Sequence, residues 1–512
     1  MRNLSGLLLL IIISSTILFF NLGVTPLLDP DEPVYAETPR EMLVYGDFVS
    51  PRIYGEYWYD KPPMYYWLVA ASFKVFGINE FAARFPSALL ALGCILAVYA
   101  AGRRLLGERA GLTSAFILAT GIEFWYLGKA AVTDITLTLC LTLSLLGFIE
   151  KRYYFLYVFA ALATLTKGPV GFLFPGAIIC LYLLFTRKFS VLKEMRLLSG
   201  TALFLVIALP WYWSMYQIHG QIFIDTFLGF HNLTRFTSPE HPEGALWYYY
   251  IPVFVAGFFP WVAVFPQAVY RALWHNERET RRILLFLVIW TLFIFAFFSI
   301  SQTKLVSYIL PMFPPAALLA GWYIDDLVGR LWRQERSWGW IGLLVVLCAL
   351  LIVTVVTGGR LLPVMETGAV LVAALLATVC GVAVYFLWYR RIYASFAVQV
   401  GGMLLFVAIL MTSLLPAAAP YFSSKDLAAQ FSQVYDGRSS VYIMKILHPG
   451  FTFYSGLYGQ EIDKEEVGTR IRQEGRSYFI IRDLDYQRLT SEELQRIQVL
   501  VRDADKLVLL KP

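Results

Sequence analysis

The chain has 512 residues, of which 58% are apolar and only 15% are charged. Soluble domains carry roughly 25% charged residues, because a folded domain needs a polar exterior. The composition therefore excludes a soluble multidomain protein, a disordered chain and a nucleic-acid-binding domain, and it predicts an α-helical polytopic membrane protein.

Thirteen apolar runs are candidate membrane helices, since a spanning helix needs about 20 apolar residues. The residues after the first run offer no small-residue cleavage site, so we expect an uncleaved helix rather than a signal peptide. In chain order the runs cover residues 6–25, 85–102, 111–127, 133–149, 153–166, 169–186, 197–216, 248–270, 283–300, 305–325, 338–357, 367–388 and 392–415.

The basic residues predict the orientation of these helices. Nineteen Lys and Arg lie in the N-terminus and the even-numbered connections, whereas four short odd-numbered connections hold one each: Lys129, Lys167, Lys304 and Arg360. Positive charge marks the cytoplasmic side. We therefore expect a bacterial inner-membrane protein with a cytoplasmic N-terminus and a periplasmic C-terminus.

Three longer segments then face the periplasm: loops 26–84 and 217–247, and the tail 421–512. The tail has ordinary soluble composition. Its patterns predict strands at 441–446, 478–482 and 507–510 and helices at 464–473 and 491–501. We expect a transmembrane domain over 1–420 and a small soluble α/β domain over 421–512.

The first loop carries adjacent carboxylates, Asp31 and Glu32, directly after the first run. Such a pair can bind a cation, orient the hydroxyls of a sugar or accept a proton. The alternative is a solvated loop that happens to be acidic.

Asp60 and Lys61 follow in the same loop, among aromatic residues and before Pro62 and Pro63. The prolines indicate a fixed turn, and a lysine there can bind a phosphate as a point charge. The alternative is an interfacial aromatic belt with one ion pair.

Other ionisable residues lie at the ends of runs: Arg84, Asp134, Lys167 and Lys304. Charged groups at such depth indicate function by default. Asp134 can equally be a helix-capping acid, and the cations can simply reach the interface. The second loop adds His219, His231 and His241, whose spacing is no metal motif in itself.

Taken in order, several short motifs resemble the lipid-carrier-dependent GT-C glycosyltransferases, in the protein O-mannosyltransferase-like group that includes the lipid A aminoarabinose transferases. The resemblance covers residues 28–320. It rests on Pro30-Asp-Glu-Pro-Val-Tyr-Ala-Glu, Asp60-Lys-Pro-Pro, Val132-Thr-Asp, Thr166-Lys-Gly, Arg235-Phe, Trp247-Tyr-Tyr-Tyr, Phe259-Pro-Trp and Tyr308-Ile-Leu-Pro-Met-Phe-Pro-Pro.

The resemblance implies a GT-C fold and a sugar donor carried on undecaprenyl phosphate. It implies that the acceptor is lipid A or another envelope molecule, with no organic cofactor. Asp31 takes the position of the family's essential aspartate, and Asp134 that of a second acid facing the cavity. Asp60 takes the position of a glutamate that binds a metal, with His241 as the second candidate ligand; Zn, Mg and Mn are the candidate ions.

Transfer separates charge, because the sugar becomes positive as the phosphate leaves. We expect Asp31, with Glu32 and Asp134, to serve the sugar and the acceptor. Lys61, Lys304, Arg84 and Lys167 are expected to bind the donor phosphate. Two alternatives remain open: transfer of a hexose or mannose to protein or glycan, and a transporter or lipid flippase. Membrane lipid is the expected environment, nucleic acid is not an expected partner, and we expect a monomer.

Overall fold

A computed structural model describes residues 4–234, 246–330, 337–361 and 363–512. Contacts divide the chain into two compact units. Unit 1 comprises Met1–Phe20, Tyr59–Tyr65 and Ser87–Leu410, and unit 2 comprises Asn21–Trp58, Tyr66–Pro86 and Met411–Pro512.

Each of the thirteen predicted runs contains a helix. The helices of this part of the chain are α1 Leu4–Phe19, α4 Glu80–Leu105, α5 Glu108–Thr120, α6 Ile122–Lys129, α7 Asp134–Ile149, α8 Tyr153–Lys167, α9 Val170–Thr186, α10 Val191–Glu194, α11 Leu197–His219, α12 Gln221–Ile224, η1 Asp225–Thr234, α14 Tyr250–Gly257, η3 Trp261–Ala263, α15 Phe265–Leu273, α16 Arg278–Ile300, η4 Val306–Met312, α17 Phe313–Arg330, α18 Trp338–Leu361, η6 Pro363–Met365, α19 Glu366–Trp388 and α20 Ile392–Ile409.

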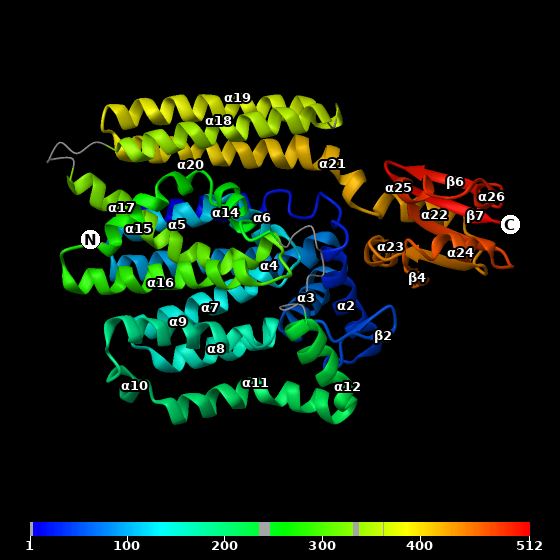
Figure 1. The fold of residues 1–512 in the computed structure, drawn as a ribbon, viewed down its shortest axis with the longest axis horizontal. Coiled ribbons are helices and arrows are strands. Elements are labelled where there is room, and N and C mark those ends of the chain that lie inside the picture. The colour runs from blue at the N-terminus through cyan, green and yellow to red at the C-terminus, as the bar shows by residue number, and fades with distance from the viewer. Residues whose placement is uncertain (1–3, 235–245, 331–336, 362) are drawn as a thin grey trace. The chain divides into compact units, whose positions relative to one another are not determined.

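Several neighbouring helices of unit 1 pack in antiparallel pairs, such as α7 with α8, α18 with α19, and α19 with α20 (Figure 1). Small residues permit the closest approaches. A Cβ on Gly321 of α17 would lie 2.2 Å from Ser114 Oγ of α5, so these two helices can touch only through a glycine.

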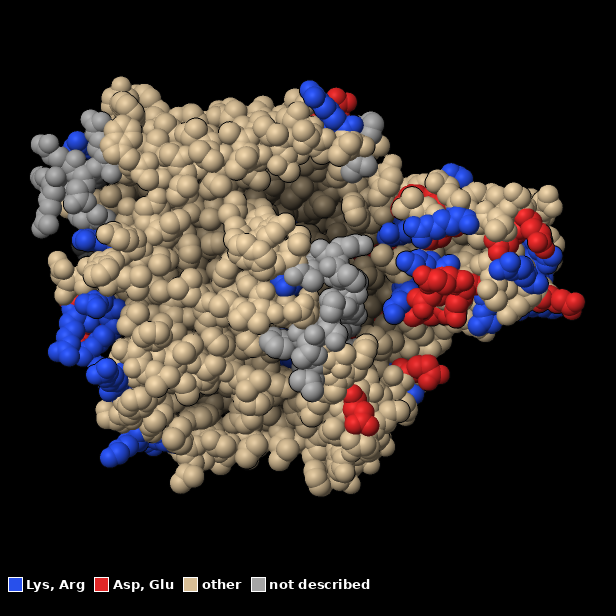
Figure 2. Space-filling model, viewed as in Figure 1, with Lys and Arg blue, Asp and Glu red and all other residues tan. Residues whose placement is uncertain are grey.

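Six helices among the described residues are long and apolar enough to cross a membrane, or eight if each of two bent pairs is one span. The bends are 64° between α5 and α6 and 111° between α14 and the segment Trp261–Leu273. Figure 2 shows a middle of uncharged residues in unit 1, with Lys and Arg gathered at the end that Figure 1 marks N. The chain is a multi-pass membrane protein, and the number thirteen stays a prediction.

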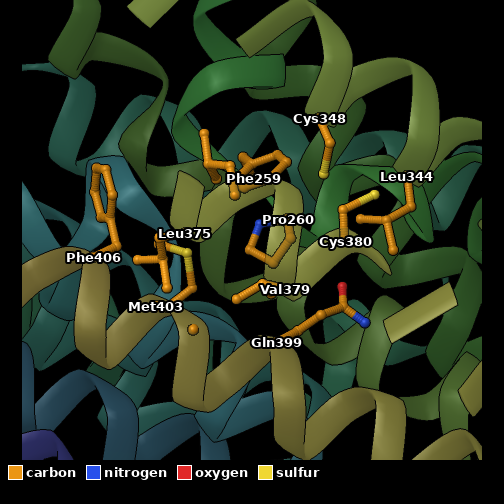
Figure 3. A pocket seen from close by; sticks show the side chains of 12 residues that line it. Phe259, Pro260, Leu344, Cys348, Leu375, Val379, Cys380, Gln399, Met403 and Phe406 are labelled. Atoms are coloured by element: carbon orange, nitrogen blue, oxygen red, sulfur yellow. The ribbon is translucent and has the colours of Figure 1, made fainter. Parts of the chain in front are cut away.

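A small apolar cavity lies in unit 1 between Phe259, Pro260 and the helices α18, α19 and α20 (Figure 3). Its wall includes the thiols of Cys348 and Cys380 and the amide of Gln399, and it has no charged residue. The polar residues that the sequence analysis singled out lie elsewhere.

Unit 2 holds a five-stranded sheet of order β4-β3-β5-β7-β6. The strands β3, β4 and β5 are parallel, whereas β7 pairs antiparallel with both β5 and β6. Phe479, Ile480 and Leu509 are fully buried in this sheet. The strands are β3 Ser440–Met444, β4 Gln460–Ile462, β5 Ser477–Arg482, β6 Gln498–Asp503 and β7 Lys506–Lys511.

The three predicted strands of the tail are confirmed, and so is the helix at 464–473. The predicted helix at 491–501 is wrong: a single turn over Ser491–Leu494 is followed by the strand β6. Val499 and Val501 of that strand pair with Leu509 and Val508 of β7, and this pairing outweighs the helical pattern of the segment.

The first loop packs with the tail inside unit 2, which the sequence did not indicate. Arg40 of α2 donates a hydrogen bond to the carbonyl of Phe453 in α23, 3.2 Å away. Lys425 of α22 pairs with Glu80 at 2.6 Å. The remaining elements are α2 Asp31–Tyr45, β1 Arg52–Ile53, β2 Glu56–Tyr57, α3 Met64–Phe76, η7 Leu410–Leu414, α21 Leu415–Phe422, α22 Lys425–Val434, α23 His448–Ser455, α24 Val467–Arg472, α25 Asp483–Tyr486 and α26 Ser491–Leu494.

Candidate active site

An ion pair joins Asp134 and Lys167 in unit 1. Asp134 is the first residue of α7 and Lys167 the last of α8, so the antiparallel packing of these helices brings the two together. Lys167 Nζ donates to Asp134 Oδ1 at 2.6 Å and lies 4.7 Å from the centroid of the Tyr308 ring. The helix ends favour this arrangement, because the N-terminus stabilises an acid and the C-terminus a cation.

Asp60 and Lys61 form a second ion pair in the same unit, 2.9 Å apart. Asp60 is buried, with 9% of its surface exposed, and the turn before α3 fixes it. Its charge also acts on Lys167. Two predicted acids and two predicted phosphate ligands therefore belong to one polar cluster.

Lys304 lies in the connection between α16 and η4, four residues before Tyr308. Its Nζ donates to the carbonyl of Ser301 at 2.5 Å. The carbonyl of the next residue, Leu305, accepts from the hydroxyl of Tyr250 at 3.1 Å. Two hydrogen bonds, from Lys304 and from Tyr250, thus hold the connection, and the lysine is buried in it.

Glu123 of α6 is an acid that the sequence analysis missed. It is 4% exposed, and neither carboxylate oxygen has a hydrogen-bond partner among the described residues. The charge of Asp134 acts on it. The signal was present in the sequence as an acid inside an apolar run, which is a functional hint in itself.

Asp31, Glu32 and Arg84 lie in unit 2. Asp31 is exposed at the N-terminus of α2, whose dipole stabilises its negative charge. Glu32 is buried and accepts two hydrogen bonds from Arg84, at 2.8 and 2.6 Å. Arg84 also donates to the carbonyls of Thr25 and Pro26, each 2.7 Å away.

These contacts give Arg84 and Glu32 partners that the sequence did not indicate. The guanidinium is directed to Glu32 and to the chain that leads into α2, and it is 4% exposed. The pair therefore fixes the segment that ends at Asp31. We assign both residues to positioning and propose no phosphate contact for Arg84.

Asp29 lies in the same segment and is enclosed in unit 2. One carboxylate oxygen accepts from Ser424 Oγ at 2.5 Å, and the other has no partner in the described residues. A Cβ on Gly450 would lie 1.8 Å from this second oxygen. Burial raises the pKa of Asp29 to about 7, against the pull of Ser424 and Lys506.

The expected metal site is only partly within the described residues. Asp60 pairs with Lys61, and His241 lies outside the described residues. Nδ1 of His219 shares a 3.1 Å hydrogen bond with the hydroxyl of Tyr59. Within the described ranges no group of three or more His, Cys, Asp or Glu could hold an ion. A metal held by Asp60 and His241 therefore stays a prediction.

Residues 60–213 match the family model of dolichyl-phosphate-mannose-protein mannosyltransferases. An uncharacterized protein of Aquifex aeolicus is 32% identical over 318 residues, which make up 62% of this chain and 73% of that protein. The chain belongs to the lipid-carrier-dependent GT-C glycosyltransferases. Both ion pairs of unit 1, Asp60–Lys61 and Asp134–Lys167, lie within residues 60–213, which the family model matches.

Two further proteins are similar to this GT-C member. The undecaprenyl phosphate-alpha-4-amino-4-deoxy-L-arabinose arabinosyl transferase 2 of Pseudomonas fluorescens is 32% identical over 337 residues, 63% of this chain. The match spans 59% of that transferase's length. The crystal structure of ArnT from Cupriavidus metallidurans bound to undecaprenyl phosphate has a TM-score of 0.81 at 24% identity, over 99% of this chain and 98% of that one. This likeness confirms the predicted GT-C fold.

Proposed function

We propose that this GT-C protein transfers 4-amino-4-deoxy-L-arabinose from undecaprenyl phosphate to lipid A or a similar anionic envelope lipid. The observation that carries the proposal is the buried cluster of Asp60, Lys61, Asp134 and Lys167, held in a chain whose relatives include named aminoarabinose transferases. Acids and lysines side by side suit a reaction that separates positive from negative charge.

In the proposed reaction the bond between the anomeric carbon and the phosphate oxygen breaks. The leaving undecaprenyl phosphate gains negative charge, which Lys61, Lys304 and Lys167 stabilise. Asp31 stabilises the positive charge that develops on the sugar. An acceptor phosphate is already ionised near neutral pH, so it attacks without a general base. An acceptor hydroxyl would need Asp31 or Asp134 to take its proton.

The reaction takes place on the periplasmic side of the inner membrane. The support is the excess of Lys and Arg in the even-numbered connections, which assigns the N-terminus to the cytoplasm and the C-terminus to the periplasm. The tail and most of the first loop, which lie in unit 2, are then on the periplasmic side as well.

The test is transfer by the purified protein in detergent, with undecaprenyl phosphate carrying aminoarabinose as donor and lipid A as acceptor. We expect Asp31→Asn to lower the rate at least about 100-fold, because a group aimed at the developing charge is lost. Glu56→Gln is the control, since Glu56 is an exposed acid of the same loop. Full activity of Asp31→Asn would contradict the mechanism. Transfer to a peptide or glycan instead of lipid A would identify a different acceptor.

A further inference from the structure

The segment 20–30, which leads into Asp31, forms no helix or strand of its own. It connects α1 with α2 and consists of turns, bends and irregular backbone. Backbone N–H and C=O groups in such a segment need hydrogen-bond partners elsewhere in the chain. The residues that supply these partners therefore decide where Asp31, the first residue of α2, is held.

The tail anchors this segment through three hydrogen bonds within unit 2. The hydroxyl of Tyr454 in α23 accepts from the backbone N–H of Leu27 at 2.7 Å. The backbone N–H of Asp29 donates to the carbonyl of Phe422 at 2.7 Å. Ser424 Oγ donates to the carboxylate of Asp29 at 2.5 Å. Leu27 and Asp29 are thus fixed by residues that lie far along the chain.

Tyr454 is itself held in place. Its hydroxyl donates to Glu80 Oε1 at 3.3 Å, and Lys425 pairs with the same oxygen at 2.6 Å. The ammonium of Lys425 also lies 5.6 Å from the centroid of the Tyr454 ring. The proton of the hydroxyl is therefore directed to Glu80, which leaves the oxygen to accept from Leu27.

Gly450 of α23 brings the tail against the same segment by close packing. A Cβ at position 450 would lie 1.8 Å from Asp29 Oδ1, so only a glycine lets α23 approach this carboxylate. Leu27 is fully buried. The segment is thus packed as well as hydrogen-bonded, and Asp31 follows Asp29 by two residues.

We propose that Tyr454 and Ser424 are positioning residues for Asp31, so that the tail is a working part of the segment that carries this acid. The inference rests on the proposed function, in which Asp31 stabilises the charge that develops on the sugar. A group in such a role must be held within about 0.5 Å of its productive place. The two hydroxyls of the tail fix the chain just before Asp31, and Arg84 adds two bonds to carbonyls of the same segment.

The test measures aminoarabinose transfer by the full-length protein in detergent. Tyr454→Phe removes the hydroxyl that accepts from Leu27, so kcat should fall about 10- to 100-fold, because a small displacement of a reacting group is costly. KM for the donor should be unchanged, since the lysines expected at the donor phosphate belong to unit 1. Tyr435→Phe is the matched control, because the hydroxyl of Tyr435 donates to the carbonyl of Ser439 at 3.1 Å within the tail.

Two further variants disturb the same segment in different ways. Ser424→Ala removes the hydrogen bond to the carboxylate of Asp29. Gly450→Ala displaces that carboxylate while both hydroxyls stay in the chain. Each variant should lower kcat without raising KM for the donor.

A second background separates positioning from a purely structural role. Loss of folded protein lowers kcat in every background, whereas positioning acts only through Asp31. In Asp31→Asn the group to be positioned is gone, so adding Tyr454→Phe should lower kcat no further. Equal falls in the two backgrounds would overturn the inference.

The outcomes distinguish this inference from the proposed function. If wild type transfers aminoarabinose and Tyr454→Phe, Ser424→Ala and Gly450→Ala keep its kcat, the positioning role is refuted and the transferase remains. If wild type transfers no aminoarabinose, the proposed function fails and the inference falls with it.

Discussion

Lys167 at the end of α8 donates a 2.6 Å hydrogen bond to Asp134 at the start of α7. The side chains are 15% and 10% exposed, so the pair is largely removed from solvent. Each residue compensates the other, and the ring of Tyr308 lies against the lysine. The pair joins Asp134, which the family resemblance predicts to face the substrate, with Lys167, which is predicted to bind the donor phosphate.

Asp134→Asn should lower the free energy of unfolding by about 3–5 kcal/mol, since it leaves Lys167 as an unpaired buried cation. The double variant Asp134→Asn with Lys167→Met removes both charges and should recover most of this loss. Transfer activity should be low in the double variant, because the proposed mechanism uses the charge of Lys167 at the donor phosphate. Thermal unfolding in detergent and the transfer assay measure the two effects. Additive losses of stability would show that the residues do not interact.

Lys61→Ala should raise KM for the donor by about 10- to 100-fold, because a charged hydrogen bond to the donor phosphate is lost. Asp60→Asn keeps the lysine's charge and should leave donor affinity close to that of wild type. Lys193→Ala, an exposed lysine of another connection, is the control. An unchanged KM in Lys61→Ala would remove this residue from the phosphate site.

Arg84→Ala should destabilise unit 2 rather than weaken donor binding. The variant leaves Glu32 buried without the guanidinium that donates to both of its oxygens. The cost is about 3–5 kcal/mol, as for other broken buried pairs, and Arg84→Lys should recover little of it, because lysine cannot donate in a fork.

The unfolding temperature of the full-length protein measures this effect, with Arg438→Ala as an exposed control. A stable Arg84→Ala that fails to bind undecaprenyl phosphate would restore the phosphate role expected from the sequence.

Much of the fold follows from the sequence, because long apolar runs leave a chain few alternatives in a membrane. The bend between α5 and α6 was not predicted, since Gly121 adopts an extended conformation in a run that reads as one helix. The strand β6 was missed because its pairing with β7 is tertiary.

The sequence singled out candidate site residues one by one, and their roles stay predictions; it did not indicate which of them pair with residues distant in the chain. Arg84 and Glu32 are 52 residues apart in sequence, so nothing local indicated that each is the other's partner. Asp134 and Lys167 are paired by the packing of two helices. Glu123 was overlooked, although an acid inside an apolar run is a signal that the sequence itself carries.

The stability of unit 2 should fall as the pH rises toward 7. Burial raises the pKa of Asp29 from 3.8 to about 7, and that of Glu37 from 4.5 to about 7. Between these values the folded chain holds protons that the unfolded chain has lost, so stability is greatest below the unfolded pKa and is lost as pH rises through the folded pKa. The slope is at most about 1.4 kcal/mol per pH unit for each group.

Asp29→Asn mimics the protonated carboxyl and should flatten this dependence. Thermal unfolding of wild type and variant in detergent, from about pH 5 to about pH 8, gives the difference in their free energies of unfolding at each pH. The contributions of the other titrating groups are the same in both proteins and drop out of this difference. An identical pH profile for the variant would show that Asp29 is ionised throughout.

The central claim is transfer of an amino sugar to an envelope lipid, with Asp31 in the reaction. The most direct measurement is mass spectrometry of lipid A from cells that carry the wild-type chain, Asp31→Asn or Glu56→Gln. The account predicts an added aminoarabinose mass with wild type and Glu56→Gln, and its loss with Asp31→Asn at equal protein levels. Lipid A without the added mass in all three strains, or with it in all three, would contradict the account.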